Sequence, residues 1–332
     1  MRKIVLAVIT ATAVAAVLLV AGPQRITLAQ DKTGDETLAT KLEQHSESGF
    51  HNLTAFTLQD GKVTFAGLGS DEHTEVEIGS VTKMLTGELA HQLVDEGKLS
   101  PDTTVGEVLD VGDAPVADVT VQELLDHTSG LPRLASTNIL SGLISAITEA
   151  NPYEGETTED IMDAATRSEL KGRGEESYSN LGYGLLGHMV ETAAGQPYEQ
   201  MLEERIFKPA GMTETYLMTP GSVPVDAPRG LTATGRHAEP WEMEGSAPAG
   251  AIRSTAHDMA KFAQWFMDNG DTDFGWQPPS ENSAGYWHNG GTYGYSTMLI
   301  IDPETKRAAF ANNDSPVGTE DLAQALFDEL AS

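Results

Sequence analysis

Apolar side chains recur every three or four residues in several stretches of the chain. Between Ser80 and Glu96 this spacing predicts a helix, and Gly97 stands where that helix would end. The same spacing predicts further helices over residues 36–47, 120–126, 157–167, 181–194, 197–207, 255–268 and 320–330. Most of the predicted helices therefore lie in the middle of the chain.

Strand patterns gather near the two ends instead. Residues 53–58 and 62–66 flank Asp60-Gly61, a dipeptide typical of a two-residue hairpin turn. Residues 295–301 and 307–312 flank the turn at 302–305. We therefore predict an α/β (α+β) fold, in which one antiparallel sheet is built from both ends of the chain and a helical region is inserted between them.

This pattern also predicts how the chain is divided. Residues 30–79 together with 250–332 are expected to form the sheet region, and residues 80–249 the mainly helical region. The two regions are expected to form one unit, and 332 residues is ample chain for a sizeable core.

The first 29 residues have the pattern of a targeting segment. Arg2 and Lys3 precede an almost entirely apolar run from 4 to 21, and the small residues of Thr27-Leu28-Ala29 stand at cleavage spacing. This predicts a signal peptide, with an uncleaved membrane anchor as the alternative. Either form predicts a secreted or otherwise extracytoplasmic protein.

Charge and cysteine content exclude several functions. The chain has 50 acidic against 20 basic residues, a net charge of −30, and no cysteine. Nucleic acid and anionic membrane surfaces are polyanions, so neither is expected as a partner, and membrane contact is expected only through an uncleaved N-terminal segment. The lack of cysteine excludes disulfides, thiolate metal sites and a cysteine nucleophile.

Candidate chemistry begins at Gly79-Ser80-Val81-Thr82-Lys83. Ser80 stands where a helix begins and Lys83 follows one turn later, so the lysine amine can reach the serine hydroxyl. A serine hydroxyl needs a nearby base to become a good nucleophile. Alone, this pattern is also that of an N-cap serine followed by a surface lysine.

Two later segments favour the catalytic interpretation. Tyr178 and Asn180 precede an apolar helix, and His288-Asn289-Gly290-Gly291 precedes a predicted strand. A lysine cation nearby would lower the pKa of Tyr178 and let it act as a base. The backbone N–H groups of Ser80 and Gly291 could form an oxyanion hole.

These three motifs, in this order, resemble the penicillin-recognising serine hydrolases. The chain looks like the branch that contains class C β-lactamases, D-Ala-D-Ala carboxypeptidases, D-aminopeptidases and esterases. In that branch, motifs of the types S-x-x-K, Y-x-N and H-x-G match those at Ser80, Tyr178 and His288. Similar ancillary stretches occur at residues 124–132, 208–212 and 247–256.

The resemblance implies both the fold and the site. It implies a β-lactamase/transpeptidase-like fold, an acyl-enzyme on Ser80, and neither a metal nor a cofactor. Lys83 and Tyr178 would share proton transfer. Substrate would be bound, and its carbonyl polarised, by Asn180, His288, Gly290 and Gly291. The substrate would be a small molecule or a peptide, with cell-wall peptide among the candidates.

One departure from the β-lactamase pattern bears on the substrate. His288 stands where β-lactamases usually carry the lysine that holds a substrate carboxylate, and residues 262–305 contain no Lys or Arg. Arg133 or Arg253 could still supply a cation from elsewhere. We therefore expect hydrolysis of peptides, amides or esters, with weak or no β-lactamase activity. A β-lactamase proper and an acylated sensor without turnover remain the alternatives.

Other motifs are better explained by structure. The triplet Gly182-x-Gly184-x-x-Gly187 could indicate a dinucleotide enzyme, but no predicted strand precedes it, so close helix packing is favoured. His127 is expected to lie in a turn after the helix at 120–126, and residues 268–273 in an acidic loop. His45, His51, His73 and His91 do not have the spacing of zinc ligands. Trp287, next to His288, is the tryptophan expected nearest the site.

Overall fold

The computed structural model describes residues 22–135, 149–280 and 285–331 of the chain. The apolar part of the predicted signal peptide, at 4–21, lies outside the described residues. Within the described ranges, no helix is both long enough and apolar enough to cross a membrane.

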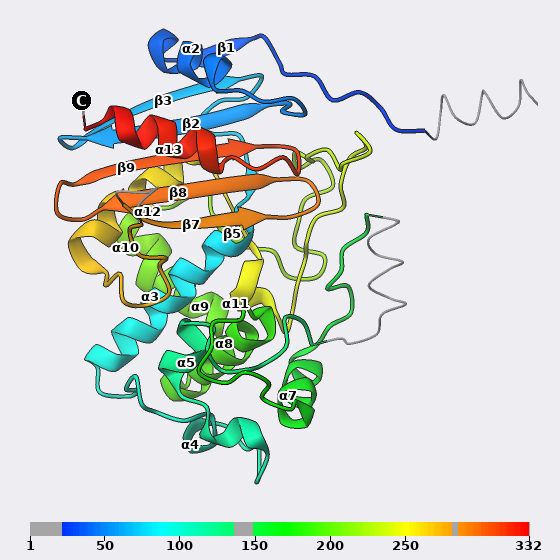
Figure 1. The fold of residues 1–332 in the computed structure, drawn as a ribbon, viewed down its shortest axis with the longest axis vertical. Helices are drawn as coiled ribbons and strands as arrows, with labels where there is room; N and C mark the ends of the chain where they lie inside the picture. The colour runs from blue at the N-terminus through cyan, green and yellow to red at the C-terminus, as the bar shows by residue number, and fades with distance from the viewer. Residues whose placement is uncertain (1–21, 136–148, 281–284, 332) are drawn as a thin grey trace, which may run out of the picture.

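A six-stranded antiparallel sheet forms the upper layer of the molecule (Figure 1), with strand order β1-β3-β2-β9-β8-β7. Its strands are β1 (Lys32–Gly34), β2 (Leu53–Gln59), β3 (Lys62–Leu68), β7 (Tyr286–Gly291), β8 (Ser296–Asp302) and β9 (Arg307–Asn313). The N-terminal hairpin β2–β3 pairs with the C-terminal strands through β2 and β9, so Phe56 lies opposite Phe310. The two rings stack with their centroids 5.6 Å apart.

Helices cover both faces of this sheet. Helices α2 (Glu36–Gln44) and α13 (Glu320–Glu329) pack on one face, where Leu42, Leu326 and neighbouring apolar residues form a separate core. Helix α12 (Ala256–Asn269) packs on the other face, with Phe262 and Phe266 buried in the main core. That second face is the one turned toward the helical region.

The remaining helices form the lower part of the molecule in Figure 1. They are α3 (Thr82–Asp95), α4 (Val105–Val108), α5 (Val121–Leu125), α7 (Thr158–Arg167), α8 (Asn180–Ala194), α9 (Tyr198–Leu202), α10 (Lys208–Ala210) and α11 (Ala247–Gly250). Helix α8 is buried along most of its length, and α3 lies between it and the sheet. The main core is therefore continuous from the sheet into the helical region.

A second, three-stranded sheet has the order β4-β6-β5 and joins the two regions. Its strands are β4 (Val76–Glu77), β5 (Tyr216–Leu217) and β6 (Ile252–Ser254). β5 lies inside the range 80–249 that the sequence predicts to be mainly helical. Strand β4 leads directly into the segment that carries Ser80.

The glycine triplet of the sequence serves helix packing. Gly187 lies on α8 where that helix meets α11, and a Cβ built on it would stand 2.1 Å from Cγ of Pro248. Gly184 approaches the backbone of Gly245 in the same way, at 3.2 Å. The segment before α8 runs over the loop at 127–133 and is no strand, so the structure favours the packing explanation and not dinucleotide binding.

The predicted fold class is confirmed. The helices predicted at 36–47, 80–96, 157–167, 181–194, 255–268 and 320–330 and both strand pairs are present, within a few residues at each end. Asp60 and Gly61 both have positive φ, as a two-residue hairpin turn of this kind requires. The strands that the sequence did not indicate are short, or carry polar and glycine residues: β1, β4, β5, β6 and β7.

Replacing Gly187 by Ala tests the packing of α8 on α11. The added methyl group collides with a proline ring, and such overpacking typically costs about 1–3 kcal/mol of unfolding free energy. Thr192→Ala, at an exposed position of the same helix, should stay within about 0.5 kcal/mol of the parent. Urea denaturation measures both, and equal stabilities for the two variants would contradict this packing.

Candidate active site

Ser80 lies in a tight turn between the small sheet and the helical region. Strand β4 ends at Glu77, a 3₁₀ turn covers Gly79–Val81, and α3 begins at Thr82. The Ser80 side chain is partly exposed, whereas its neighbours on both sides are buried. The turn thus presents the hydroxyl to solvent at the N-terminal end of a buried helix, where positive dipole ends favour developing negative charge.

The turn lies against the end of strand β7. Gly79 has a φ of +50°, and a Cβ on it would stand 2.7 Å from the backbone nitrogen of Gly291. A Cβ on Gly290 would stand 2.0 Å from the carbonyl oxygen of Ile78. Glycine is therefore required on both segments for the backbones around Ser80 and Gly291 to approach each other.

Lys83 is fully buried and makes three polar contacts. Its Nζ lies 3.2 Å from Oγ of Ser80, 2.9 Å from Oδ1 of Asn180 and 2.6 Å from the carbonyl oxygen of Ala249. Lys83 itself lies on α3, and its contacts come from the 3₁₀ turn before α3, from the start of α8 and from α11. The serine turn and two neighbouring helices therefore fix the position of one amine.

Tyr178 reaches the same serine from the loop before α8. Its hydroxyl donates to Oγ of Ser80 at 2.6 Å, and Lys83 Nζ lies 4.8 Å from the centroid of its ring. The next residue, Ser179, caps α8 by accepting a hydrogen bond from the backbone of Gly182 at 2.8 Å. The cap fixes where the helix begins and so where Tyr178 stands.

Asn180 is the first residue of α8, and both the oxygen and the nitrogen of its side-chain amide form hydrogen bonds. Its Oδ1 accepts from Lys83, and its Nδ2 donates to the hydroxyl of Tyr153 at 2.7 Å. It is buried. In the structure Asn180 therefore orients Lys83.

The pKa values of Lys83 and Tyr178 are both shifted in the direction that favours the neutral side chain. Burial lowers the pKa of Lys83 well below its usual value, and the cation of Arg133 adds to this. Burial raises the pKa of Tyr178, although the Ser80 hydrogen bond and Arg133 oppose the change. The expectation of a lowered pKa for Tyr178 is wrong, because the cost of burying a phenolate outweighs these opposing effects.

The contacts of Lys83 suit a neutral amine. A neutral amine has two N–H groups and one lone pair, and two of its three contacts are carbonyl oxygens that can only accept. The lone pair then faces the third contact, Ser80. With Tyr178 donating to Ser80 Oγ, the serine proton is free to point at Lys83. The geometry therefore prepares Lys83 as the base that takes this proton.

His288 lies on β7 and is buried. Burial, together with the nearby Lys83, lowers its pKa to about 3, so it is neutral at ordinary pH. Its Nδ1 lies 2.6 Å from the carbonyl oxygen of Asn289. Gly291, three residues on, is exposed, and a Cβ on it would meet open space. This end of the strand therefore has room for a substrate, but His288 offers no cation.

His127 supports the site without being a member of any motif. Its ring lies 4.4 Å from the ring of Tyr178, centroid to centroid, and its Nδ1 accepts from the backbone nitrogen of Ser179 at 3.1 Å. Burial lowers its pKa to about 3. It has a positive φ in a turn after α5, as the sequence predicts. The contact with Tyr178 was not predictable from that turn.

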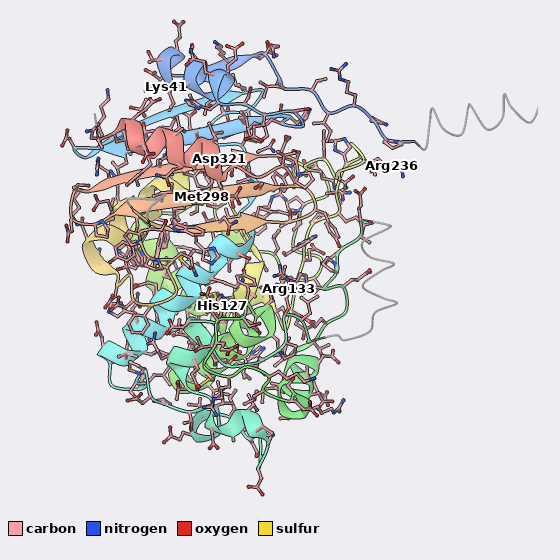
Figure 2. The ribbon with its side chains drawn as sticks, in the orientation of Figure 1. Lys41, His127, Arg133, Arg236, Met298 and Asp321 are labelled. Carbon is pink, nitrogen blue, oxygen red and sulfur yellow. The ribbon has the colours of Figure 1, made fainter. Side chains whose placement is uncertain are left out.

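Of the two arginines considered from the sequence, only Arg133 lies at the site. Its guanidinium carbon is 5.0 Å from the centroid of the Tyr178 ring, and Figure 2 shows it near His127. No carboxylate among the described residues forms an ion pair with it. Arg253 is buried and bonds Glu75 at 2.9 Å and the backbone of Pro228.

Trp241, and not Trp287, is the tryptophan beside the catalytic residues. Its ring lies 5.4 Å from that of Tyr153, which bonds Asn180, and 5.3 Å from that of Tyr293. Trp287 packs against the core on the opposite face of the sheet, since side chains alternate along β7. The expectation for Trp287 is therefore wrong.

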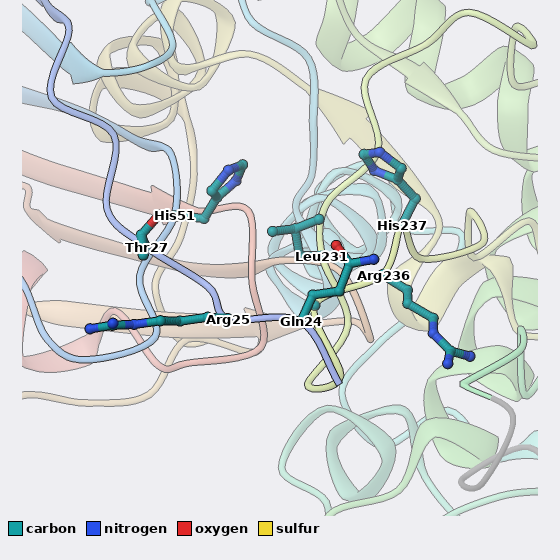
Figure 3. A pocket seen from close by; sticks show the side chains of 8 residues that line it. Gln24, Arg25, Thr27, His51, Leu231, Arg236 and His237 are labelled. Atoms are coloured by element: carbon teal, nitrogen blue, oxygen red, sulfur yellow. The ribbon is translucent and has the colours of Figure 1, made fainter. Parts of the chain in front are cut away.

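A separate pocket lies away from Ser80. It has a volume of about 550 Å³ and is lined by residues within 24–27, by His51 and by residues within 231–237 (Figure 3). Gln24, Arg25 and Thr27 form part of its wall. Cleavage after Ala29 would remove these three residues, so we assign no function to this pocket.

Comparison with known proteins identifies the family. The family model for β-lactamases matches residues 38–326. This chain belongs to the β-lactamase family. It is 30% identical to penicillin-binding protein 4 of Amycolatopsis lactamdurans, over 86% of this chain and 84% of that protein.

Solved structures confirm the β-lactamase/transpeptidase-like fold. A D-stereospecific amidohydrolase from Streptomyces superposes with a TM-score of 0.74 at 18% identity, over 88% of this chain and 98% of that one. A β-lactamase/D-alanine carboxypeptidase from Yersinia pestis gives a TM-score of 0.73 at 21% identity, over 89% and 99%. At these identities the likeness shows the fold.

The pH dependence of the reaction should report Lys83. If neutral Lys83 takes the Ser80 proton, kcat/KM should rise with pH through the lowered pKa of Lys83 and then level off. His288, with a pKa of about 3, does not titrate in that range. His288→Asn should therefore leave the pH midpoint of this rise unchanged, whatever it does to the maximal rate. Loss of the rise in this variant would contradict its assignment to Lys83.

Proposed function

We propose that this β-lactamase-family hydrolase cleaves peptide, amide or ester bonds through an acyl-enzyme on Ser80, and that it does so outside the cytoplasm. The observation that carries the proposal is the convergence of Lys83 and Tyr178 on one oxygen, at 3.2 and 2.6 Å from Oγ of Ser80. A base and a proton donor on the same partly exposed hydroxyl are the requirements of nucleophilic catalysis.

The reaction follows from this geometry. Ser80 Oγ bonds to the substrate carbonyl carbon while its proton passes to the lone pair of Lys83. The backbone N–H groups of Ser80 and Gly291 stabilise the oxyanion, at about 3 kcal/mol per donor in other enzymes. Tyr178 protonates the leaving nitrogen or oxygen, the bond to it breaks, and Lys83 returns the proton to Tyr178. Water then attacks the acyl-enzyme by the reverse sequence and frees Ser80.

Arg133 supports a substrate that carries a carboxylate on its leaving group. It lies beside Tyr178, which would protonate that leaving group, and it is exposed and unpaired within the described part of the chain. A guanidinium fork binds a carboxylate through two hydrogen bonds. A peptide with a free C-terminus fits this arrangement, so we propose carboxypeptidase-type cleavage ahead of ester hydrolysis.

We propose that β-lactam turnover is weak. Neutral, buried His288 occupies the third-motif position, and Arg133 lies on the Tyr178 side of Ser80 instead. A sensor that is acylated but does not turn over remains the second candidate, and a burst of product without a steady phase would favour it.

Replacing Ser80 by Ala should abolish turnover of every substrate in a panel of D-Ala-D-Ala peptide, D-amino-acid amide, p-nitrophenyl ester and nitrocefin. The substitution removes the nucleophile and not the fold, so the circular dichroism spectrum should be unchanged. The parent protein should turn over the peptide, amide or ester in a steady phase and nitrocefin poorly. Residual steady turnover by Ser80→Ala above the uncatalysed rate would contradict the proposal, and diffusion-limited nitrocefin hydrolysis by the parent would contradict weak β-lactamase activity.

Replacing Arg133 by Gln tests carboxylate recognition. The loss of one exposed ion pair should raise KM for a D-Ala-D-Ala peptide with a free C-terminus about three- to tenfold. KM for the same peptide with an amidated C-terminus should not change. Arg133→Lys, which keeps the charge without the fork, should give an intermediate value. An equal effect of Arg133→Gln on both peptides would contradict the role.

A further inference from the structure

Three side chains of metal-binding type meet at the surface, although they are far apart in the sequence. His73 lies in the turn before β4, Glu214 lies between α10 and β5, and His257 lies in the first turn of α12. Their potential ligand atoms all lie within 4.8 Å of one another. None of the three bonds Ser80, Lys83, Tyr178 or Asn180 within the described residues.

Both histidines direct the same ring atom at one carboxylate. Nδ1 of His73 lies 2.9 and 3.1 Å from the two oxygens of Glu214, and Nδ1 of His257 lies 3.2 Å from Oε2. Two ligands of a tetrahedral Zn²⁺, at about 2.0–2.1 Å from the metal, are about 3.3 Å apart. The nitrogen–oxygen separations are therefore close to those of a metal site, and small side-chain rotations would complete it.

Glu214 is held in position by contacts that leave it able to bind a cation. Its backbone nitrogen donates to Oδ2 of Asp258 at 2.6 Å, and Oε2 accepts from the hydroxyl of Thr255 at 3.0 Å. The backbone nitrogen of His257 donates to the carbonyl oxygen of Glu72 at 2.9 Å. The backbone thus brings the two histidines together at one oriented carboxylate, as outer hydrogen bonds do at metal sites.

Local charge favours a cation over two protonated rings. The ring centroids of His73 and His257 are only 4.6 Å apart, so two imidazolium ions would repel each other. Asp258 lies 3.7 Å from Nδ1 of His257, and Glu72 lies 4.0 Å from Nε2 of His73. A divalent ion would bind one unprotonated nitrogen of each ring and compensate this acidic surface.

We propose that His73, Glu214 and His257 bind one Zn²⁺, or another first-row divalent ion that prefers imidazole, with water completing the coordination. Two nitrogens and one carboxylate suit zinc better than calcium or magnesium, which prefer oxygen. The ion would join the turn before β4, the segment before β5 and the start of α12. All three adjoin the small sheet that leads to Ser80, so the site braces the fold and takes no part in the reaction.

Zinc titration of the purified, metal-stripped protein tests this site. Isothermal calorimetry should give one Zn²⁺ per chain, and zinc should raise the melting temperature. His73→Ala and His257→Ala should each weaken binding at least tenfold and remove the thermal shift. His237→Ala, which removes an exposed histidine elsewhere, is the matched control and should behave like the parent.

A spectroscopic measurement on the parent protein makes the test independent of the stability of the variants. Co²⁺ bound with four or five ligands at this site should absorb strongly in the visible range, and added Zn²⁺ should displace the Co²⁺ and remove that absorption. Weak absorption like that of aqueous Co²⁺, no zinc binding, or zinc binding equally strong in His73→Ala, His257→Ala and His237→Ala would overturn the proposal. The cluster would then be a hydrogen-bonded histidine–carboxylate group only.

Discussion

The structure around the site depends on the burial of one lysine amine. Water no longer solvates Lys83, so the neutral form is favoured, and the two carbonyl-type acceptors on Asn180 and Ala249 take its two N–H groups. Only one direction is left for the lone pair, toward Ser80. Burial therefore changes a residue that is ordinarily a surface cation into a base aimed at a hydroxyl.

The architecture supplies the groups that make this burial tolerable. Helix α3 carries Lys83, the serine turn, α8 and α11 each provide one contact, and glycines on α8 let α11 approach closely enough for Ala249 to reach the amine. The large sheet brings β7 to the serine turn, and Gly79 and Gly290 permit the close approach of their backbones. Residues from distant parts of the chain thus act on one oxygen because the fold places three helices and one strand end together.

Much of this was predictable from the sequence because it depends on local pattern. The apolar spacing of α3 and α8, the turn at Asp60-Gly61 and the three motifs led to the fold class, the family and the residues around Ser80. The contacts of Arg133, His127 and Trp241 with this site depend on loop paths that no period in the sequence encodes. The direction of the Tyr178 pKa shift was also beyond the sequence, because it depends on how far Tyr178 itself is buried. Strand β7 was not predicted because its polar and glycine residues do not alternate with apolar ones. The cluster of His73, Glu214 and His257 was not predicted because its members are far apart in the sequence.

The central claim is that Lys83 is a neutral base in the free enzyme, and NMR titration of lysine labelled at Cε and Nζ tests it most directly. Lys83→Arg, which removes the signal, assigns the resonance. The account predicts that the Lys83 resonance titrates well below the usual value of 10.5, apart from the other lysines. Titration of this resonance together with them, near 10.5, would contradict the account.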